Sequence, residues 1–190
     1  MARTSKTLEE IQERELRRLI MSYQDFQHAS WIASYILDKK LQDIVDQGGK
    51  QGYDARRHWQ ALNCAMVVTY CRPFSGNDKR TPQPIPDLHK RFLKKLTLKG
   101  RKWHDVAMQD RDKVLAHSDS EAWNLQLGFW ETGRKNKMLI LQHNDTKAPL
   151  IREVIKQLKQ NCEIFMEAIM GERRRLEREL AHVLPTVKDL

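Results

Sequence analysis

Apolar residues recur at helical spacing over long stretches at both ends of this 190-residue chain. One stripe runs from Leu16 to Ile44, and another runs from Ile151 to Val183 after a proline, a residue that is favourable at a helix start. A repeat of three to four residues buries one face of a helix. The sequence therefore predicts a long amphipathic helix at each end, over residues 1–50 and 149–184.

The N-terminal helix has a predicted start and a predicted end. Thr7 and Glu10 match a capping box, which would begin the helix. The apolar stripe continues to about residue 46, with room for a kink. Gly48, Gly49 and Gly52 then predict the break that ends it. A second helix is expected from near Asp54 to the residues before the next proline.

The middle of the chain predicts a loop, two further helices and two strands. Residues 72–86 hold four prolines and predict an exposed Pro-rich loop. Helices are expected over 88–96, capped by Asp87, and over 99–117. Alternating apolar residues on both sides of a Gly-containing turn predict a β-hairpin insertion over 120–143. The expected fold is a mainly α, single-domain bundle of four to five helices over 1–190, with this hairpin inserted.

Charge points to an anionic partner. The chain has 34 Lys and Arg against 25 Asp and Glu, a net charge of +9. Such an excess favours nucleic acid, of which RNA is the first candidate. The simpler interpretation is a solvated basic surface without a dedicated ligand.

Cysteine and histidine spacing argues against disulfides and metal sites. Cys64 and Cys71 lie seven residues apart, about 10 Å on a helix, too far for a disulfide. Cys162 is the third cysteine. The histidines form no ligand cluster with zinc-like spacing, so no metal and no cofactor are expected. No apolar run has membrane-spanning length, and the first residues lack a signal-peptide core, which predicts a cytoplasmic protein.

A compact polar motif lies at the end of the predicted 99–117 helix. Arg111 is followed directly by Asp112, and His117 comes five intervening residues after Arg111, ahead of Ser118-Asp119. Arginine is permanently cationic and suits a phosphate, whereas histidine exchanges protons near neutral pH. Without any further role, the same residues would form ion pairs and end a helix.

The stretch "RDKVLAHSD" from Arg111 resembles the signature of the HEPN superfamily, an Arg separated by four to six residues from a His with a polar residue after the Arg. Residues 61–77 are similar to the preceding helix of HEPN-like abortive-infection proteins, including an Arg-Pro-Phe step. The resemblance spans about residues 56–165. It implies a helical module, in many members an RNase of toxin–antitoxin and phage-defence systems, generally a homodimer, sometimes with an antitoxin partner.

The resemblance implies a metal-independent cleavage of RNA by attack of a ribose 2′-hydroxyl on the adjacent phosphate. His117 would be the general base or acid, and Arg111 would hold the phosphate and offset the growing charge. Asp112 would orient Arg111 or His117. Arg and His six positions apart are not helix neighbours, so they would meet in one groove or in a composite cleft across a two-fold axis.

Other candidates flank the motif. Tyr70 and Arg72 are candidates to line the same cleft. The densest basic run precedes the motif and is a candidate RNA track, with a solvated face as the alternative; its members are Lys90, Arg91, Lys94, Lys95, Arg101 and Lys102. Among the tryptophans, Trp31, Trp59 and Trp103 are expected in the core, and Trp123 and Trp130 on a partner surface.

Two functions therefore remain open. The first is a HEPN-type endoribonuclease. The second is a non-catalytic helical module that binds a protein or nucleic acid and keeps the motif for structure. An apolar stripe expected to be exposed at Leu176, Leu180 and Val183, beyond the reach of a small bundle, adds to the case for a homodimer.

Overall fold

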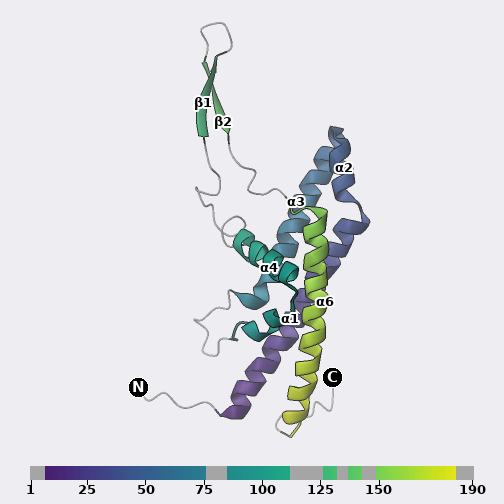
Figure 1. The fold of residues 1–190 in the computed structure, drawn as a ribbon, viewed down its shortest axis with the longest axis vertical. Coiled ribbons are helices and arrows are strands. Elements are labelled where there is room, and N and C mark those ends of the chain that lie inside the picture. Colours follow the sequence, from purple (N-terminus) through teal and green to yellow (C-terminus); the bar gives the residue numbers. More distant parts are fainter. Residues whose placement is uncertain (1–6, 76–84, 112–125, 132–136, 143–148, 183–190) are drawn as a thin grey trace, which may run out of the picture.

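The computed structural model describes residues 7–75, 85–111, 126–131, 137–142 and 149–182. These residues are mainly helical, as the apolar periodicity predicted (Figure 1). The longest two, α1 (Leu8–Asp38) and α6 (Arg152–Glu179), run beside each other and form the axis of the bundle.

Helix α1 begins at the predicted capping box. The Thr7 hydroxyl accepts the backbone N–H of Glu10 at 3.2 Å, and the Glu10 carboxylate accepts the N–H of Thr7 at 3.1 Å. The helix ends at Asp38, because Lys40 adopts a left-handed conformation with φ of 49°. The short helix α2 (Leu41–Gln47) follows, so the predicted helix over 1–50 is two helices with a break between them.

Helix α3 (Gly49–Cys71) starts five residues earlier than the sequence predicted. Gly48 and Gly49 have φ of 72° and 67° and form the turn before it. Gly52 was expected in the break but lies inside the helix. A Cβ there would lie 3.2 Å from the carbonyl oxygens of Ile44 and Val45. Its glycine signal therefore marks a close approach of α2 rather than a helix end.

Three short elements connect α3 to the motif. The 3-10 turn η1 (Arg72–Phe74) is followed, after residues outside the described part, by the 3-10 helix η2 (Lys90–Lys95) and by α4 (Leu98–Asp110). The expected helix over 88–96 is thus a 3-10 helix. Its cap is His89, whose Nδ1 accepts the N–H of Arg91 at 3.0 Å, and not Asp87 as predicted.

Two strands, β1 (Gln126–Glu131) and β2 (Lys137–Gln142), pair antiparallel with Gln126 opposite Gln142 and Glu131 opposite Lys137. The remaining residues of the predicted 120–143 insertion lie outside the described part, and so does most of the predicted 72–86 loop.

An aromatic cluster fills the centre of the bundle between α1, α3, η1 and α6. The rings of Phe26 and Phe165 stack with centroids 4.8 Å apart, and Phe74 lies 5.4 Å from Phe165. Of the tryptophans expected in the core, Trp59 is buried and Trp103 is half-buried. The expectation for Trp31 is wrong, since it is 61% exposed on α1.

The end of α6 is covered by α1. Leu176 and Leu180 are 0% and 1% exposed, so the apolar stripe expected on the surface is buried within the subunit. Gln12 of α1 donates to Glu179 of α6 at 2.9 Å across this end. The two helices have matching lengths, which is why the end of α6 does not outrun the bundle. Val183 lies outside the described residues.

Two sequence expectations concern residue chemistry. Cys64, Cys71 and Cys162 are not in disulfides, and the spacing had excluded one between Cys64 and Cys71. Among the described helices, none combines the length and the apolar character needed to cross a membrane.

Candidate functional site

Helix α4 carries the start of the Arg111 motif and is fixed at its first turn. The Thr97 hydroxyl accepts the N–H of Gly100 at 3.0 Å and caps the helix. Gly100, His104 and Ala107 form its buried face. The helix ends at Asp110. Arg111 keeps helical angles (φ −59°, ψ −47°) and its N–H bonds the carbonyls of Ala107 and Met108.

A buried polar cluster joins α4 to α3 and α6. The Tyr70 hydroxyl lies 3.1 Å from His104 Nδ1. The Asn161 amide donates to that hydroxyl at 3.2 Å and to the Gly100 carbonyl at 2.9 Å. Gln157 donates to the Asn161 oxygen at 3.3 Å. Buried hydrogen-bonded networks of this kind hold elements in one arrangement.

Burial changes the protonation of this cluster. It raises the pKa of the Tyr70 hydroxyl well above its ordinary value and lowers the pKa of His104. Both groups are therefore neutral at pH 7, and the Tyr70–His104 contact is a bond between uncharged partners. From the sequence, we inferred only that the histidines form no metal-ligand cluster, and His104 was given no role. Its place on the same face as Ala107, two turns before Arg111, is the signal that identifies it as an anchor of α4.

The motif itself is described only at its first residue. Arg111 is half-buried at the end of α4. Asp112 and His117 lie outside the described residues, so the structure gives no geometry between Arg111 and His117. Asp110, directly before Arg111, has its carboxyl pKa raised by burial.

The last turn of α4 meets the last turn of α3. The Cys71 thiol donates to the Ala107 carbonyl at 3.4 Å, one turn before Arg111. Arg72 follows Cys71 directly, which places its backbone at this junction. Its side chain is 57% exposed and forms an ion pair with Asp25 of α1 at 2.9 Å. Tyr70, the other candidate of the same helix end, is fully buried in the polar cluster.

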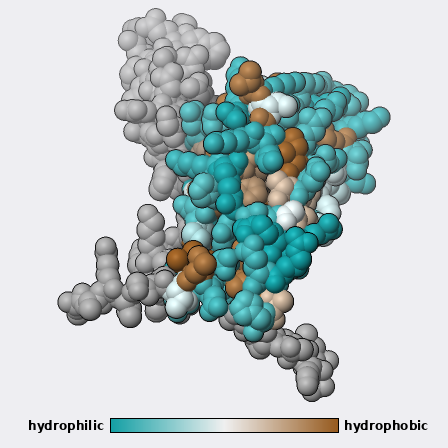
Figure 2. All heavy atoms as spheres, turned by 60° about the horizontal axis from the view of Figure 1, so that its bottom comes forward, coloured by the Kyte–Doolittle hydropathy of each residue, from teal (hydrophilic) through white to brown (hydrophobic). Residues whose placement is uncertain are grey.

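The predicted basic run lies on η2 and the start of α4, which follow each other closely. All six side chains, Lys90, Arg91, Lys94, Lys95, Arg101 and Lys102, belong to exposed residues. Arg101 Nε donates to the Leu93 carbonyl at 3.1 Å and ties α4 to η2. Lys102 Nζ lies 5.5 Å from the centre of the Trp103 ring. The surface of this end of the bundle is mostly hydrophilic, with hydrophobic residues in separate small patches (Figure 2).

Arg91 differs from the other members of the basic run because it forms ion pairs with two carboxylates. It contacts Glu15 of α1 at 2.5 Å and Glu172 of α6 at 2.6 Å. Hydrogen bonds from Arg175 and the charge of Arg91 lower the pKa of the Glu172 carboxyl. Because two carboxylates already offset its charge, Arg91 is better suited to joining α1, η2 and α6 than to binding a phosphate.

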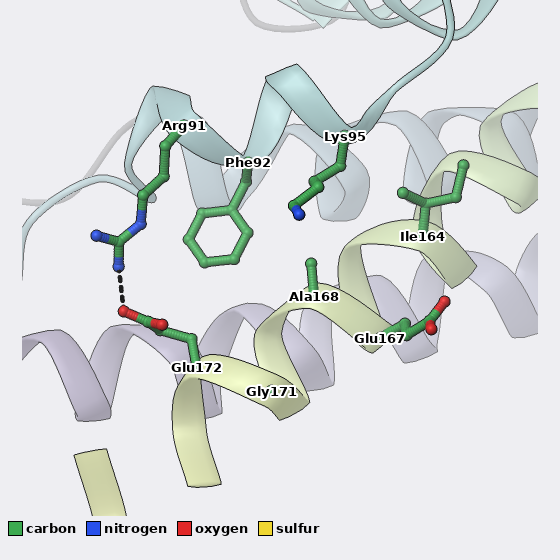
Figure 3. Close-up of a pocket in the computed structure, with 8 residues that line it drawn as sticks. All are labelled: Arg91, Phe92, Lys95, Ile164, Glu167, Ala168, Gly171 and Glu172. Atoms are coloured by element: carbon green, nitrogen blue, oxygen red, sulfur yellow. Dashed lines mark hydrogen bonds and ion pairs between the residues drawn. The ribbon is translucent and has the colours of Figure 1, made fainter. Parts of the chain in front are cut away.

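A groove lies between η2 and α6 beside this ion pair. Phe92 projects into it from η2 and Ala168 from α6, and Arg91 reaches across one end to Glu172 (Figure 3). The Lys95 side chain extends over the groove from η2. Charges of both signs at its edges argue against a dedicated anion site there.

A second groove, between α1 and α3, was not predicted. Its lining is mainly apolar and aromatic, and none of its lining residues is Asp, Glu, Lys or Arg; they are His28, Trp31, Ile32, Tyr35, Leu41, His58, Ala61 and Leu62. Trp31 and Tyr35 are 61% and 51% exposed at its edge. The two residues lie one turn apart on α1, and of these two only Trp31 had been expected in the core.

The chemistry of the described side chains gives no metal centre. No group of three or more His, Cys, Asp or Glu side chains within that part of the chain is arranged to hold a metal ion.

In comparisons with known proteins, no protein-family model, no curated protein and no solved structure matches this chain.

Proposed function

We propose that this protein is a HEPN-type, metal-independent endoribonuclease. The observation that carries the proposal is the fixed end of α4. The polar cluster of Tyr70, His104 and Asn161 anchors the helix, and Arg111 directly follows its last turn. A phosphate clamp needs a defined position, because misplacement of about 1 Å at a reacting group is costly.

Arg72 supports the same site. The Cys71–Ala107 contact brings the end of α3 against the last turn of α4. If the Arg72 guanidinium turned from Asp25 toward this junction, it would add to the attraction for an RNA phosphate. Arg72 already pairs with Asp25, whose carboxyl pKa is raised by burial. Release of Arg72 from that pair would cost part of the gain.

In the proposed reaction, the ribose 2′-oxygen bonds to the adjacent phosphorus as the bond to the 5′-oxygen breaks. His117 removes the 2′-hydroxyl proton or protonates the leaving 5′-oxygen. Arg111 stabilises the charge that grows on the phosphate oxygens, and Asp112 orients Arg111 or His117. The products are a 2′,3′-cyclic phosphate end and a 5′-hydroxyl end.

The test is incubation of pure protein with total RNA in the presence of EDTA. We expect cleavage by the wild type, and loss of on the order of 100-fold or more in rate for Arg111→Ala and for His117→Ala. Arg111→Lys should also fail, because lysine lacks the planar fork. Arg174→Ala and His182→Ala, exposed on and just after the end of α6, are matched controls that should cleave normally.

Equal cleavage by the wild type and His117→Ala, or none by any form, would refute the enzyme proposal. Loss of the helical CD spectrum in His117→Ala would instead assign the histidine to the end of a helix. These readings are separable because folding and cleavage are measured on the same samples.

The RNA contact is proposed on Lys90, Lys94, Lys95, Arg101 and Lys102, with Arg91 held by its carboxylates. Binding through phosphates releases counterions, so the affinity should fall steeply as salt rises. An affinity independent of salt would argue against this surface.

The second candidate is a non-catalytic module that binds a partner protein. The α1–α3 groove favours it, because Trp31 and Tyr35 project from α1 beside an uncharged lining, and aromatic residues are enriched in protein interfaces.

In the HEPN proposal the same groove is the candidate homodimer contact, in place of the C-terminal stripe that the fold buries. Light scattering at micromolar concentration on wild type and Trp31→Ser tests this: a monomeric wild type would refute the dimer.

Two remaining parts of the proposal rest on the resemblance. They are the hairpin over 120–143 as an insertion in a HEPN-like bundle, and a role in phage defence or as a growth-arresting toxin with an antitoxin. A cytoplasmic location is proposed because cysteines outside disulfides fit a reducing compartment. Growth arrest on expression of the wild type, relieved by His117→Ala, would support the toxin role.

A further inference from the structure

An arginine is buried inside the bundle without full pairing. Arg18 lies in the first half of α1 and is 2% exposed. Its Nε donates to the carbonyl oxygen of Pro86, which fixes the plane of the guanidinium. Its two terminal nitrogens, Nη1 and Nη2, are inaccessible and have no hydrogen-bond partner. Four N–H donors of one cation are therefore unsatisfied.

Ser22 repeats this pattern one turn further along α1. It is 0% exposed, and its hydroxyl has no hydrogen-bond partner. Residues four apart in a helix lie on the same face, about 5–6 Å apart at their Cβ atoms. The side chains of Arg18 and Ser22 therefore start from neighbouring positions on one buried face of α1.

The carboxylates near Arg18 do not complete this pairing. Asp25 forms an ion pair with a different arginine, Arg72, at 2.9 Å. Asp87 and Asp25 raise the pKa of Arg18, but burial is the larger influence and lowers it. A buried cation that lacks hydrogen-bonded pairing is costly, and almost all buried polar groups in native proteins have partners.

The unsatisfied nitrogens call for a partner that accepts several hydrogen bonds. A negative charge on that partner would add to the charges of Asp87 and Asp25 in offsetting the guanidinium. A tetrahedral oxyanion meets both needs, since two of its oxygens match the planar fork of an arginine and a third can accept from a serine hydroxyl. We propose that Arg18 and Ser22 form an internal binding site for a phosphate-class oxyanion, separate from the proposed cleavage site at Arg111.

The proposal explains why an arginine is placed among core residues at all. Leu16, Leu19 and Phe26 on the same helix are buried apolar residues, and an apolar side chain at position 18 would satisfy packing alone. Arg17 provides the contrast. It is the adjacent arginine, is exposed, and pairs with Glu13 at 2.6 Å in an ordinary surface ion pair.

The test measures thermal unfolding of the full chain in potassium phosphate against potassium chloride at equal ionic strength and pH. A ligand that binds only the folded state raises the melting temperature as its concentration rises. We expect phosphate to stabilise the wild type and the control Arg17→Met equally, and to have no specific effect on Arg18→Met. Ser22→Ala should bind phosphate about ten-fold more weakly, as expected for one lost hydrogen bond to a charged group.

Direct titration of inorganic phosphate by calorimetry keeps the test decisive if Arg18→Met does not fold, because Ser22→Ala removes only one oxygen atom. Equal responses to phosphate and chloride in the wild type would overturn the proposal and assign the site to buried water. So would equal phosphate affinity in the wild type and Ser22→Ala.

A second arm identifies the source of the oxyanion. A short RNA with a 5′-phosphate and the same RNA with a 5′-hydroxyl are titrated in competition with inorganic phosphate. Displacement by the 5′-phosphorylated form alone identifies a nucleic-acid end as the ligand, whereas no displacement by either identifies free phosphate. Cleavage assays on Arg18→Met are scored separately, so failure of this site and failure of the proposed nuclease are distinguishable.

Discussion

Gly100→Ala tests how tightly α4 is held against α6. A Cβ at position 100 would lie 2.7 Å from the Asn161 side-chain oxygen and 3.2 Å from the Thr97 hydroxyl. Asn161 has little freedom to move, since it is 0% exposed and its amide donates both to Tyr70 and to the Gly100 carbonyl. We therefore expect this substitution to disturb the polar cluster rather than to be absorbed by it.

The magnitude follows from two opposing effects. Alanine is favoured over glycine inside a helix by up to about 1 kcal/mol. Overpacking costs about 1–3 kcal/mol, and each weakened hydrogen bond adds about 1 kcal/mol. The net expectation is a loss of about 1–2 kcal/mol in the free energy of unfolding. For a chain of this size that lowers the melting temperature by roughly 2–8 °C.

Urea denaturation followed by CD is the assay, with the midpoint as the readout and the slope as a check that the unfolded state is unchanged. The matched control is Gly171→Ala in α6, where a Cβ would meet nothing within 4 Å. That variant should be stabilised by up to about 1 kcal/mol.

A double-mutant cycle isolates the clash. In an Asn161→Ala background the obstructing oxygen is gone, so Gly100→Ala should become neutral or stabilising. If Gly100→Ala is as stable as the wild type, or if its cost persists unchanged in the Asn161→Ala background, then the polar cluster does not hold α4 as described.

Three further outcomes are expected. Burial lowers the pKa of His104 below 6.5, so the unfolded chain takes up this proton at a higher pH than the folded chain. The free energy of unfolding measured by urea titration should therefore be full above about pH 6.5 and decline as the pH falls through and below that value. His104→Gln should flatten this decline. Leu176→Ala should cost about 2–5 kcal/mol because the side chain is 0% exposed, whereas Leu98→Ala, at 87% exposed, should change stability by less than about 0.5 kcal/mol. Lys94→Glu with Lys95→Glu should weaken RNA binding and reduce its salt dependence, and an unchanged slope in fluorescence anisotropy would contradict the basic surface.

Long apolar stripes predicted the two longest helices, and the spacing of Thr7 and Glu10 predicted the capping box. The break at Lys40 was not specified, because a left-handed lysine carries none of the local signal that glycine provides. The prediction that Gly52 lies in a helix break was also wrong. Its small size serves the approach of α2, and a pattern along one chain segment does not show contacts with another.

Burial was harder to predict than helix formation. Trp31 and Leu176 both lie on apolar stripes, yet one is exposed and the other buried. Which residues of a stripe are buried depends on the neighbouring helices. The end of α6, with Leu176, is covered by α1.

The candidate site was predicted only in part. The sequence located Arg72 and the basic run on exposed positions, but it did not indicate that Arg91 is held by Glu15 and Glu172. It gave no reason to separate the buried Arg18 from the exposed Arg17. Neighbouring arginines look alike in a sequence, and only packing distinguishes them.

The pairing of α1 with α6 also affects how the chain can be re-engineered. The side chain of His182 lies 3.7 Å from that of Glu9. The start of α1 and the end of α6 are therefore at the same end of the bundle (Figure 1). A circular permutant that joins residues 7 and 182 through a short linker and opens at Gly48–Gly49 should keep every helix intact. New ends at the opposite pole would then carry a fluorescent label or fused domain far from the α1–α6 junction.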